Sequence, residues 1–190
     1  MGYEKRKYSV VPYRDEWRAI YEREAALIGD TLRDELIFIE HVGGTAVPGL
    51  GGAAAIDVLA TVQNIGKIDS FNTAFKMIGY EALGARIAEN ARFFKKDLLR
   101  ETGEEERLIN LHVFPDEHPT MMDMLDVRDY LIAHPDEARK YHEFKEKLFG
   151  KHPRDYGAYR EGKDAYLAKL SGRARKWKGR RVSSEEGAVE

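Results

Sequence analysis

The sequence predicts a mixed α/β or α+β domain in which one sheet is centred on residues 36–115 and the C-terminal third is helical. Short β-branched and apolar segments fill the central region and are separated by glycine-rich or polar turns, a pattern typical of strands. From Pro119 onward, apolar residues instead recur every three or four positions, as they do in helices that bury one face. One helix, a sheet and then further helices predict a single domain over residues 1–170.

The chain enters this domain through a helix that begins near Asp15. The apolar residues that follow fall on one helical stripe: Trp17, Ile20, Tyr21, Ile28 and Leu32. Two strands, over residues 36–42 and 53–62, then flank a loop (residues 43–52) that contains five glycines and a proline. Glycine at this density predicts backbone that bends sharply or approaches another group closely.

The sheet resumes after a short helix over residues 68–78. Residues 80–97 predict one or two further strands, and after a polar turn residues 108–114 predict a strand of alternating character. Because alternate residues of a strand share a face, Asn110 and His112 are expected to point to the same side.

Three helices are predicted after Pro119, and His134 ends the first of them. The second and third continue the same apolar spacing on either side of Gly150. Residues 171–190 are first basic and then acidic and offer little to bury, so we expect a tail that is either flexible or docked only at Trp177.

Composition limits the function classes. The 190 residues include no cysteine, which excludes a disulfide framework, a thiolate zinc site and a cysteine nucleophile. With 31 Lys+Arg against 33 Asp+Glu the formal net charge is −2, so we expect no nucleic-acid partner. No apolar run approaches the ~18 residues of a membrane span, and the first residues lack the apolar centre of a secretory signal. We therefore expect a soluble cytoplasmic protein without a membrane partner; no pattern specifies its oligomeric state.

The glycine-rich loop and the strand after it combine the parts of a phosphate site. Backbone N–H groups of a glycine-rich turn can surround phosphate oxygens, and a carboxylate on the next strand can hold the Mg²⁺ that neutralises them. Asp57 is such a carboxylate, with Ile56 and Val58 on either side. Since a buried acid needs a partner, Asp57 either coordinates a metal or accepts hydrogen bonds that hold the loop in place.

This order of strand, Gly-Gly turn and strand with an Asp resembles the nucleotidyltransferase superfamily. The stretch is more closely similar to the GrpB family, whose signature runs approximately E-H-[IV]-G-S-T-[AS]-V-P-G-L-x-x-K-P-I-I-D-[IL]. The matching residues are Glu40, His41, Val42, Gly43, Thr45, Val47, Pro48, Gly49, Leu50, Ile56 and Asp57. In the C-terminal half, VRDYLIAHPDEARKYHEFK resembles the family's F-R-D-Y-L-R-x-H-P-x-x-A-x-x-Y-x-x-x-K, so the similarity spans about residues 10–170.

The resemblance implies a nucleotidyltransferase-like fold and Mg²⁺-dependent transfer of a nucleotidyl group from an NTP to an unknown acceptor. The site residues that it implies are Gly43, Gly44 and Thr45 for the triphosphate, Asp57 for the metal, and His112 or His41 for the base that deprotonates the acceptor. Each histidine also has a structural interpretation: His112 as a hydrogen-bonded residue of the strand, and His41 as a strut of the loop.

The chain departs from the family pattern at positions where a ligand would lie. A serine, a Lys-Pro pair, a histidine and an arginine of the family are replaced by Gly44, residues 53–54 (both Ala), Asn110 and Ile132. The superfamily's D-x-D is reduced to Asp57, whereas two-metal catalysis uses several carboxylates. These departures favour an alternative function, a non-catalytic protein that binds a nucleotide or another phosphorylated small molecule and has lost the metal-binding carboxylates.

Four cations are the candidates for binding phosphates. Arg128, Lys145 and Lys163 interrupt apolar helical stripes, and Arg92 lies on a predicted strand. Taken singly, each is explained by a salt bridge or by a long stem that reaches solvent. Taken together, they predict an electropositive pocket beside the glycine-rich loop. If Arg128, Lys145 and Lys163 are fully salt-bridged, an interaction module without a small ligand is the remaining class.

Overall fold

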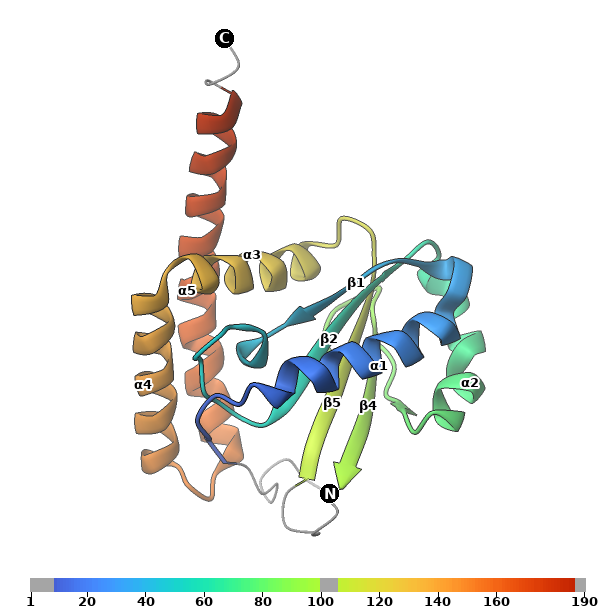
Figure 1. Cartoon of the computed structure of the whole chain (residues 1–190), viewed down its shortest axis with the longest axis horizontal. Coiled ribbons are helices and arrows are strands. Elements are labelled where there is room, and N and C mark those ends of the chain that lie inside the picture. Colours follow the sequence, from blue (N-terminus) through green and yellow to red (C-terminus); the bar gives the residue numbers. More distant parts are fainter. Residues whose placement is uncertain (1–8, 100–105, 187–190) are drawn as a thin grey trace.

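The computed structural model describes residues 9–99 and 106–186, and it has one five-stranded sheet with helices on both faces (Figure 1). The prediction of a mixed sheet flanked by helices, with a helical C-terminal third, is confirmed. The elements, with 3₁₀ helices marked η, are α1 (Glu16–Leu32), η2 (Arg33–Glu35), β1 (Leu36–Val42), η3 (Gly44–Ala46), β2 (Ala55–Val62), η4 (Ile65–Phe71), α2 (Asn72–Met77), β3 (Glu81–Ala82), β4 (Arg92–Leu99), β5 (Glu106–Pro115), α3 (Pro119–Ala133), α4 (Pro135–Lys151) and α5 (Tyr156–Glu186).

The strands of the sheet follow the order β1-β2-β5-β4-β3. β2 and β5 run parallel to each other, and every other neighbouring pair is antiparallel. A parallel pair needs a crossover connection, which η4, α2, β3 and β4 supply. β2 and β5 therefore lie inside the sheet with a neighbour on each side, which suits their apolar sequences.

One face of the sheet packs against α1 and α2 (Figure 1). The buried side chains of this core include Trp17, Ile20, Ile28, Ile56, Val58, Phe75, Phe94, Ile109 and Leu111. α1 also buries Glu24, whose carboxylate accepts hydrogen bonds from the Tyr80 hydroxyl at 2.9 Å and from Lys96 Nζ at 2.9 and 3.1 Å. The buried carboxylate of Glu24 therefore has hydrogen-bond partners inside this apolar core.

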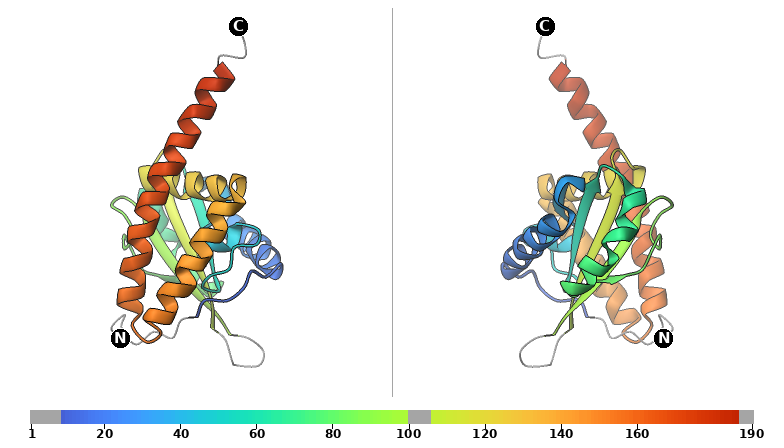
Figure 2. Two further views of the ribbon diagram at one scale, coloured as in Figure 1. Left: turned by 90° about the vertical axis from the view of Figure 1, so that its left-hand side faces the viewer. Right: turned by 90° about the vertical axis from the view of Figure 1, so that its right-hand side faces the viewer.

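The opposite face of the sheet is covered at one end by α3, where Leu59, Phe114 and Met121 pack together. α4 and α5 lie side by side (Figure 2) and form a separate apolar cluster with α3. Val47 and Leu50 of the glycine-rich loop belong to this second cluster. The loop is thereby packed against the helical third of the chain.

Several predicted boundaries differ from the observed ones. The helix predicted over residues 68–78 is divided into η4 and α2, and the strand predicted from residue 53 begins at Ala55. Residues 80–97 contain the two-residue strand β3 and most of β4.

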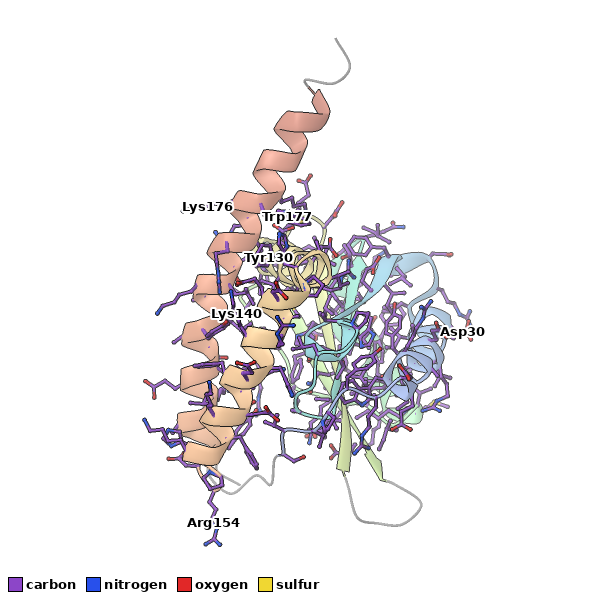
Figure 3. The ribbon with its side chains drawn as sticks, turned by 60° about the vertical axis from the view of Figure 1, so that its left-hand side comes forward. Asp30, Tyr130, Lys140, Arg154, Lys176 and Trp177 are labelled. Carbon is purple, nitrogen blue, oxygen red and sulfur yellow. The ribbon has the colours of Figure 1, made fainter. Side chains whose placement is uncertain are left out.

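The C-terminal segment needs a correction, because α5 runs without a break across residue 170 to Glu186 (Figure 1). Ala174 is buried in the cluster with α3 and α4, and Lys178 forms an ion pair with Asp126. Figure 3 shows Trp177 directed toward Tyr130, with 5.9 Å between their ring centroids. Residues 171–178 are thus a helix docked at several points; residues 187–190 of the predicted tail lie outside the described residues.

Among the residues that the structure describes, no helix is both long enough and apolar enough to cross a bilayer.

Candidate functional site

The pairing of β2 with β5 brings three predicted or suspected site residues together. Asp57 is the register partner of Asn110, and both point to the face of the sheet that carries Leu59, which we call the site face. Asp57 Oδ1 accepts a hydrogen bond from Asn110 Nδ2 at 2.9 Å and lies 3.1 Å from His112 Nε2. The other ring nitrogen of His112 is buried and has no hydrogen-bond partner among the described residues. Asp57 therefore sets the orientation of this imidazole.

Asp57 is held in its ionised form. Burial raises the pKa of the Asp57 carboxyl, but hydrogen bonds from His112 and Asn110 and the positive charges of His112 and Lys163 outweigh it, so the net shift is downward. The side chain is still 26% exposed. An ionised, accessible carboxylate is thus present where the sequence predicted one.

The first glycine of the loop is in direct contact with this carboxylate. Gly43 has φ +75° and ψ −170°, a conformation that is essentially reserved for glycine. A Cβ atom on Gly43 would lie 2.5 Å from Asp57 Oδ2. One carboxylate oxygen of Asp57 therefore interacts with side chains of β5, and the other occupies space that only a glycine at position 43 leaves open.

Lys145 of α4 is enclosed by the same loop. It is 4% exposed, its Nζ donates to the carbonyl oxygen of Gly51, and the ammonium lies 4.6 Å from the centre of the Tyr141 ring. A Cβ atom would lie 3.4 Å from this Nζ at Gly44 and 2.7 Å from it at Gly52. A side chain at position 52 would therefore displace the ammonium of Lys145, whereas a Cβ atom at Gly44 would make an ordinary van der Waals contact with it.

The electrostatics of Lys145 follow from this enclosure. Burial, and secondarily the positive charge of Lys163, lower the pKa of the Lys145 ammonium to about 7. Within the described residues Lys145 has no carboxylate partner. Lys163 of α5 is partly exposed and its nearest ion pair, with Asp164, spans 3.8 Å. Asp57 and Lys145 both approach the loop, at Gly43 and at Gly52, and the positive charge of Lys163 acts on the pKa values of both.

His41 does not share the site face with Asp57. It pairs with Val58 in the sheet, and its ring stacks on Tyr21 of α1 with a centroid distance of 4.6 Å. Its Nε2 lies 3.0 Å from the Thr45 hydroxyl, which in turn donates to the carbonyl of Ala55 at 3.2 Å. These contacts favour the interpretation of His41 as a strut of the loop, and they also occupy the Thr45 hydroxyl.

Burial lowers the pKa of His41 to about 4, with the negative charge of Asp57 opposing the shift and the positive charge of Arg128 adding to it. His41 is consequently neutral at pH 7. It retains the lone pair that a base requires, but its contacts direct that ring toward the loop and α1, away from the Asp57 carboxylate.

Arg128 of α3 forms ion pairs and a hydrogen bond at the edge of the sheet, so its guanidinium already has partners. Its guanidinium donates to Glu40 Oε2 at 2.7 Å, to the carbonyl of His41 at 3.0 Å and to Asp129 at 2.8 Å. The Tyr21 hydroxyl donates to the carbonyl of Ile39 at 3.2 Å in the same way. β1 is an edge strand, and these two side chains satisfy carbonyls that would otherwise offer a pairing surface.

Arg92 needs a correction, because it lies on the face of the sheet opposite Asp57. It pairs with Val113, whose side chain belongs to the core under α1. Its guanidinium binds both carboxylate oxygens of Asp69 at 2.7 and 2.8 Å. Four predicted residues therefore gather with the loop glycines at the site, namely Asp57, His112, Lys145 and Lys163, whereas Arg92 does not.

Two residues of β4 that the sequence interpretation missed do lie on the site face. Phe93 is the register partner of His112, and Lys95 is the register partner of Asn110. A strand that includes these residues was visible in the sequence. Its register against β5 was not, and only that register decides that Phe93 and Lys95 share the site face.

The fit of the site to Mg²⁺ rests on its carboxylates. No group of three or more His, Asp or Glu side chains able to hold a metal occurs in the described ranges. Asp57 already interacts with Asn110, His112 and Gly43. The described side chains therefore do not complete a two-metal centre, which uses several carboxylates.

Comparison with known proteins is consistent across sequence and structure. The GrpB protein family matches residues 7–173. The UPF0157 protein YqkA of Bacillus subtilis is 30% identical over 93% of this chain, which spans only 50% of that relative's length. The UPF0157 protein PA4798 of Pseudomonas aeruginosa is 32% identical over 88% of this chain and 68% of its own.

The same relationship holds in three dimensions. The crystal structure of conserved protein GrpB from Enterococcus faecalis superposes with a TM-score of 0.80 and 29% sequence identity, over 88% of this chain and 98% of that one. The sheet and helices described above are therefore shared with a protein whose structure has been solved.

Proposed function

The chain belongs to the GrpB protein family, and from the geometry of its site we propose that it binds a nucleotide or another phosphorylated small molecule beside the glycine-rich loop. The observation that carries this proposal is Lys145, a buried cation that has no carboxylate partner among the described residues. A buried charge is costly unless it is compensated, and burial accordingly lowers the pKa of Lys145 to about 7; an anion bound beside the ammonium would offset this cost.

The charges around Lys145 support the same conclusion. Lys163 adds a second positive charge, and its pair with the partly exposed Asp164 at 3.8 Å contributes little. The negative charge on this side is that of Asp57, which is already paired with His112. A phosphate group bound between the loop, Lys145 and Lys163 would offset the excess of positive charge.

Titration calorimetry with pyrophosphate and with a set of nucleotides tests this function. We expect Lys145→Met and Lys163→Met each to weaken binding about tenfold or more, because a hydrogen bond to a charged group contributes about 1.5–3 kcal/mol. Lys147→Met is a matched control, since Lys147 is exposed on the same helix. Binding that is equal in all three variants, or absent from the unmodified protein, would contradict the proposal.

The second candidate is Mg²⁺-dependent nucleotidyl transfer from an NTP to an acceptor. It is favoured by the ionised and partly exposed Asp57, which follows the Gly-Gly turn as the superfamily resemblance requires. Mg²⁺ in such sites is often held by one or two carboxylates together with phosphates of the substrate, so Asp57 would be its protein ligand. His112, bonded to Asp57, would be the nearest candidate for the base.

The two candidates differ in their dependence on metal. Transfer predicts that ATP or CTP raises the melting temperature more with Mg²⁺ than with EDTA, and that Asp57→Ala removes this difference. Binding alone predicts the same increase in both solutions. Release of pyrophosphate from an NTP in the presence of candidate acceptors would identify transfer directly.

A further inference from the structure

We propose that the ligand site continues across the site face to β4, where Phe93 and Lys95 bind a planar ring carried by the phosphorylated ligand. This inference rests on the proposed binding function and specifies its ligand class. It assigns the phosphate to Lys145 and Lys163 and the ring to β4.

The register of three strands places the necessary side chains in two rows. Asp57, Asn110 and Lys95 are successive partners across β2, β5 and β4. The next row on the same face begins with Leu59 and continues through His112 to Phe93. Since neighbouring strands are about 4.8 Å apart, Lys95 lies roughly 10 Å from Asp57 along its row. The row of polar side chains from Asp57 to Lys95 is therefore longer than a single phosphate group.

Phe93 is the most informative residue in these rows. It is partly exposed, and it belongs to none of the three apolar cores formed by the described residues. Its ring contacts the His112 ring, at a centroid distance of 5.2 Å and an interplanar angle of 47°. By contrast, its neighbour Phe94 is buried in the core under α1. A partly exposed aromatic ring beside a polar row is suited to stacking on a ligand.

Lys95 provides a donor at the end of the polar row. Its Nζ pairs with Asp97 Oδ1 at 2.9 Å, and the two side chains are 29% and 51% exposed. An exposed pair of this kind contributes little to stability, so the ammonium can exchange it for an acceptor on a ligand. Asn110, between Lys95 and Asp57, keeps its amide nitrogen on Asp57.

These features select a ligand class by chemistry. A bare phosphate or an aliphatic phosphate would use the lysines beside the loop and leave Phe93 without a role. A phosphorylated compound with an aromatic heterocycle would use both ends of the site, because the π face stacks on Phe93 and a ring or sugar acceptor meets Lys95.

Binding of AMP, ribose 5-phosphate and pyrophosphate, compared by calorimetry on the full chain, tests the inference. We expect AMP to bind more tightly than ribose 5-phosphate. Phe93→Leu should weaken AMP at least about fivefold and leave pyrophosphate unchanged, whereas Phe93→Tyr, which keeps the ring, should bind AMP as the unmodified protein does. Met77→Ala, at a residue that is 84% exposed on α2, is the control.

The possible outcomes distinguish failure of the ring-binding inference from failure of the proposed phosphate-binding function. If AMP and ribose 5-phosphate bind equally and Phe93→Leu changes neither, the inference is wrong while the proposed phosphate function stands. If Phe93→Leu weakens AMP and pyrophosphate alike, the residue does not contact a ring and the inference is also wrong. If none of the three compounds binds, the proposed function fails and the inference with it. The comparison of ligands on the unmodified protein remains decisive if Phe93→Leu does not fold.

Discussion

Replacement of Gly43 by alanine tests whether the loop is held against Asp57. Two separate penalties are expected. The backbone conformation, φ +75° with ψ −170°, costs a non-glycine residue about 1–3 kcal/mol. The new Cβ would lie 2.5 Å from Asp57 Oδ2 and 3.2 Å from Asp57 Cβ, and overpacking of this kind costs about 1–3 kcal/mol more. We therefore expect Gly43→Ala to lower the free energy of unfolding by about 2–6 kcal/mol.

The same loop contains a matched control. Gly49 has φ +77°, but nothing lies within 4 Å of the position its Cβ would take. Gly49→Ala therefore carries the backbone penalty alone, about 1–2 kcal/mol. The difference between the two variants isolates the contact with Asp57.

Urea denaturation followed by circular dichroism gives both free energies of unfolding. In a double-mutant cycle, Asp57→Ala combined with Gly43→Ala should cost less than the sum of the two single variants, because the first substitution removes Oδ2. Equal losses at Gly43 and Gly49 would refute the reasoning, as would additive losses in the cycle. Either result would mean that the loop does not depend on close packing against Asp57.

Three further predictions concern buried charges. Burial lowers the pKa of Lys145 from its ordinary 10.5 to about 7, so between pH 7 and pH 10.5 the unfolded chain binds a proton that the folded chain does not. The free energy of unfolding should therefore rise with pH across this range, by at most about 1.4 kcal/mol per pH unit. Lys145→Met should abolish that rise when urea denaturation is measured at several pH values. The pKa of His41 falls from 6.5 to about 4, so stability should be lost as pH falls through this range, and His41→Gln should reduce the loss measured in the same way. Lys96→Met leaves the buried Glu24 with the hydroxyl of Tyr80 as its main partner, and should lower the free energy of unfolding by about 3–5 kcal/mol in urea denaturation. A second substitution, Glu24→Gln, should recover part of that stability. A loss below about 1 kcal/mol for Lys96→Met would show that the ion pair is dispensable.

The sequence predicted most of the fold because the relevant signals are local. Helical stripes and β-branched runs depend on residues a few positions apart, and they identified the helices and the strands β1, β2 and β5. Asp57 stood out for the same reason, as a lone acid in an apolar strand after a Gly-Gly turn. The loop glycines were recognised as a close approach of backbone to another group, although the groups approached are Asp57 and Lys145 of the protein itself.

The prediction of Arg92 as a site residue failed because local patterns carry no register. A shift of one residue between β4 and β5 exchanges the two faces of the strand, so the sequence cannot decide whether Arg92 or Lys95 lies on the site face. The docking of the C-terminal segment as a helix was not predicted, for a related reason. Few apolar residues follow residue 170, and the docking of α5 at Ala174, Trp177 and Lys178 depends on partners from α3 that are distant in sequence.

The sequence by itself determined the family, the mixed α/β class, the exclusion of thiol chemistry and the pairing of a glycine-rich loop with Asp57. These properties are carried by residue types and their spacing along the chain. Only the tertiary structure decided which charges remain uncompensated. Arg92 and Arg128 are neutralised by Asp69, Glu40 and Asp129, whereas Lys145 lies buried without an acid among the described residues. That distinction depends on distances between helices and strands, because a cation is a phosphate ligand or a structural ion pair according to what packs against it.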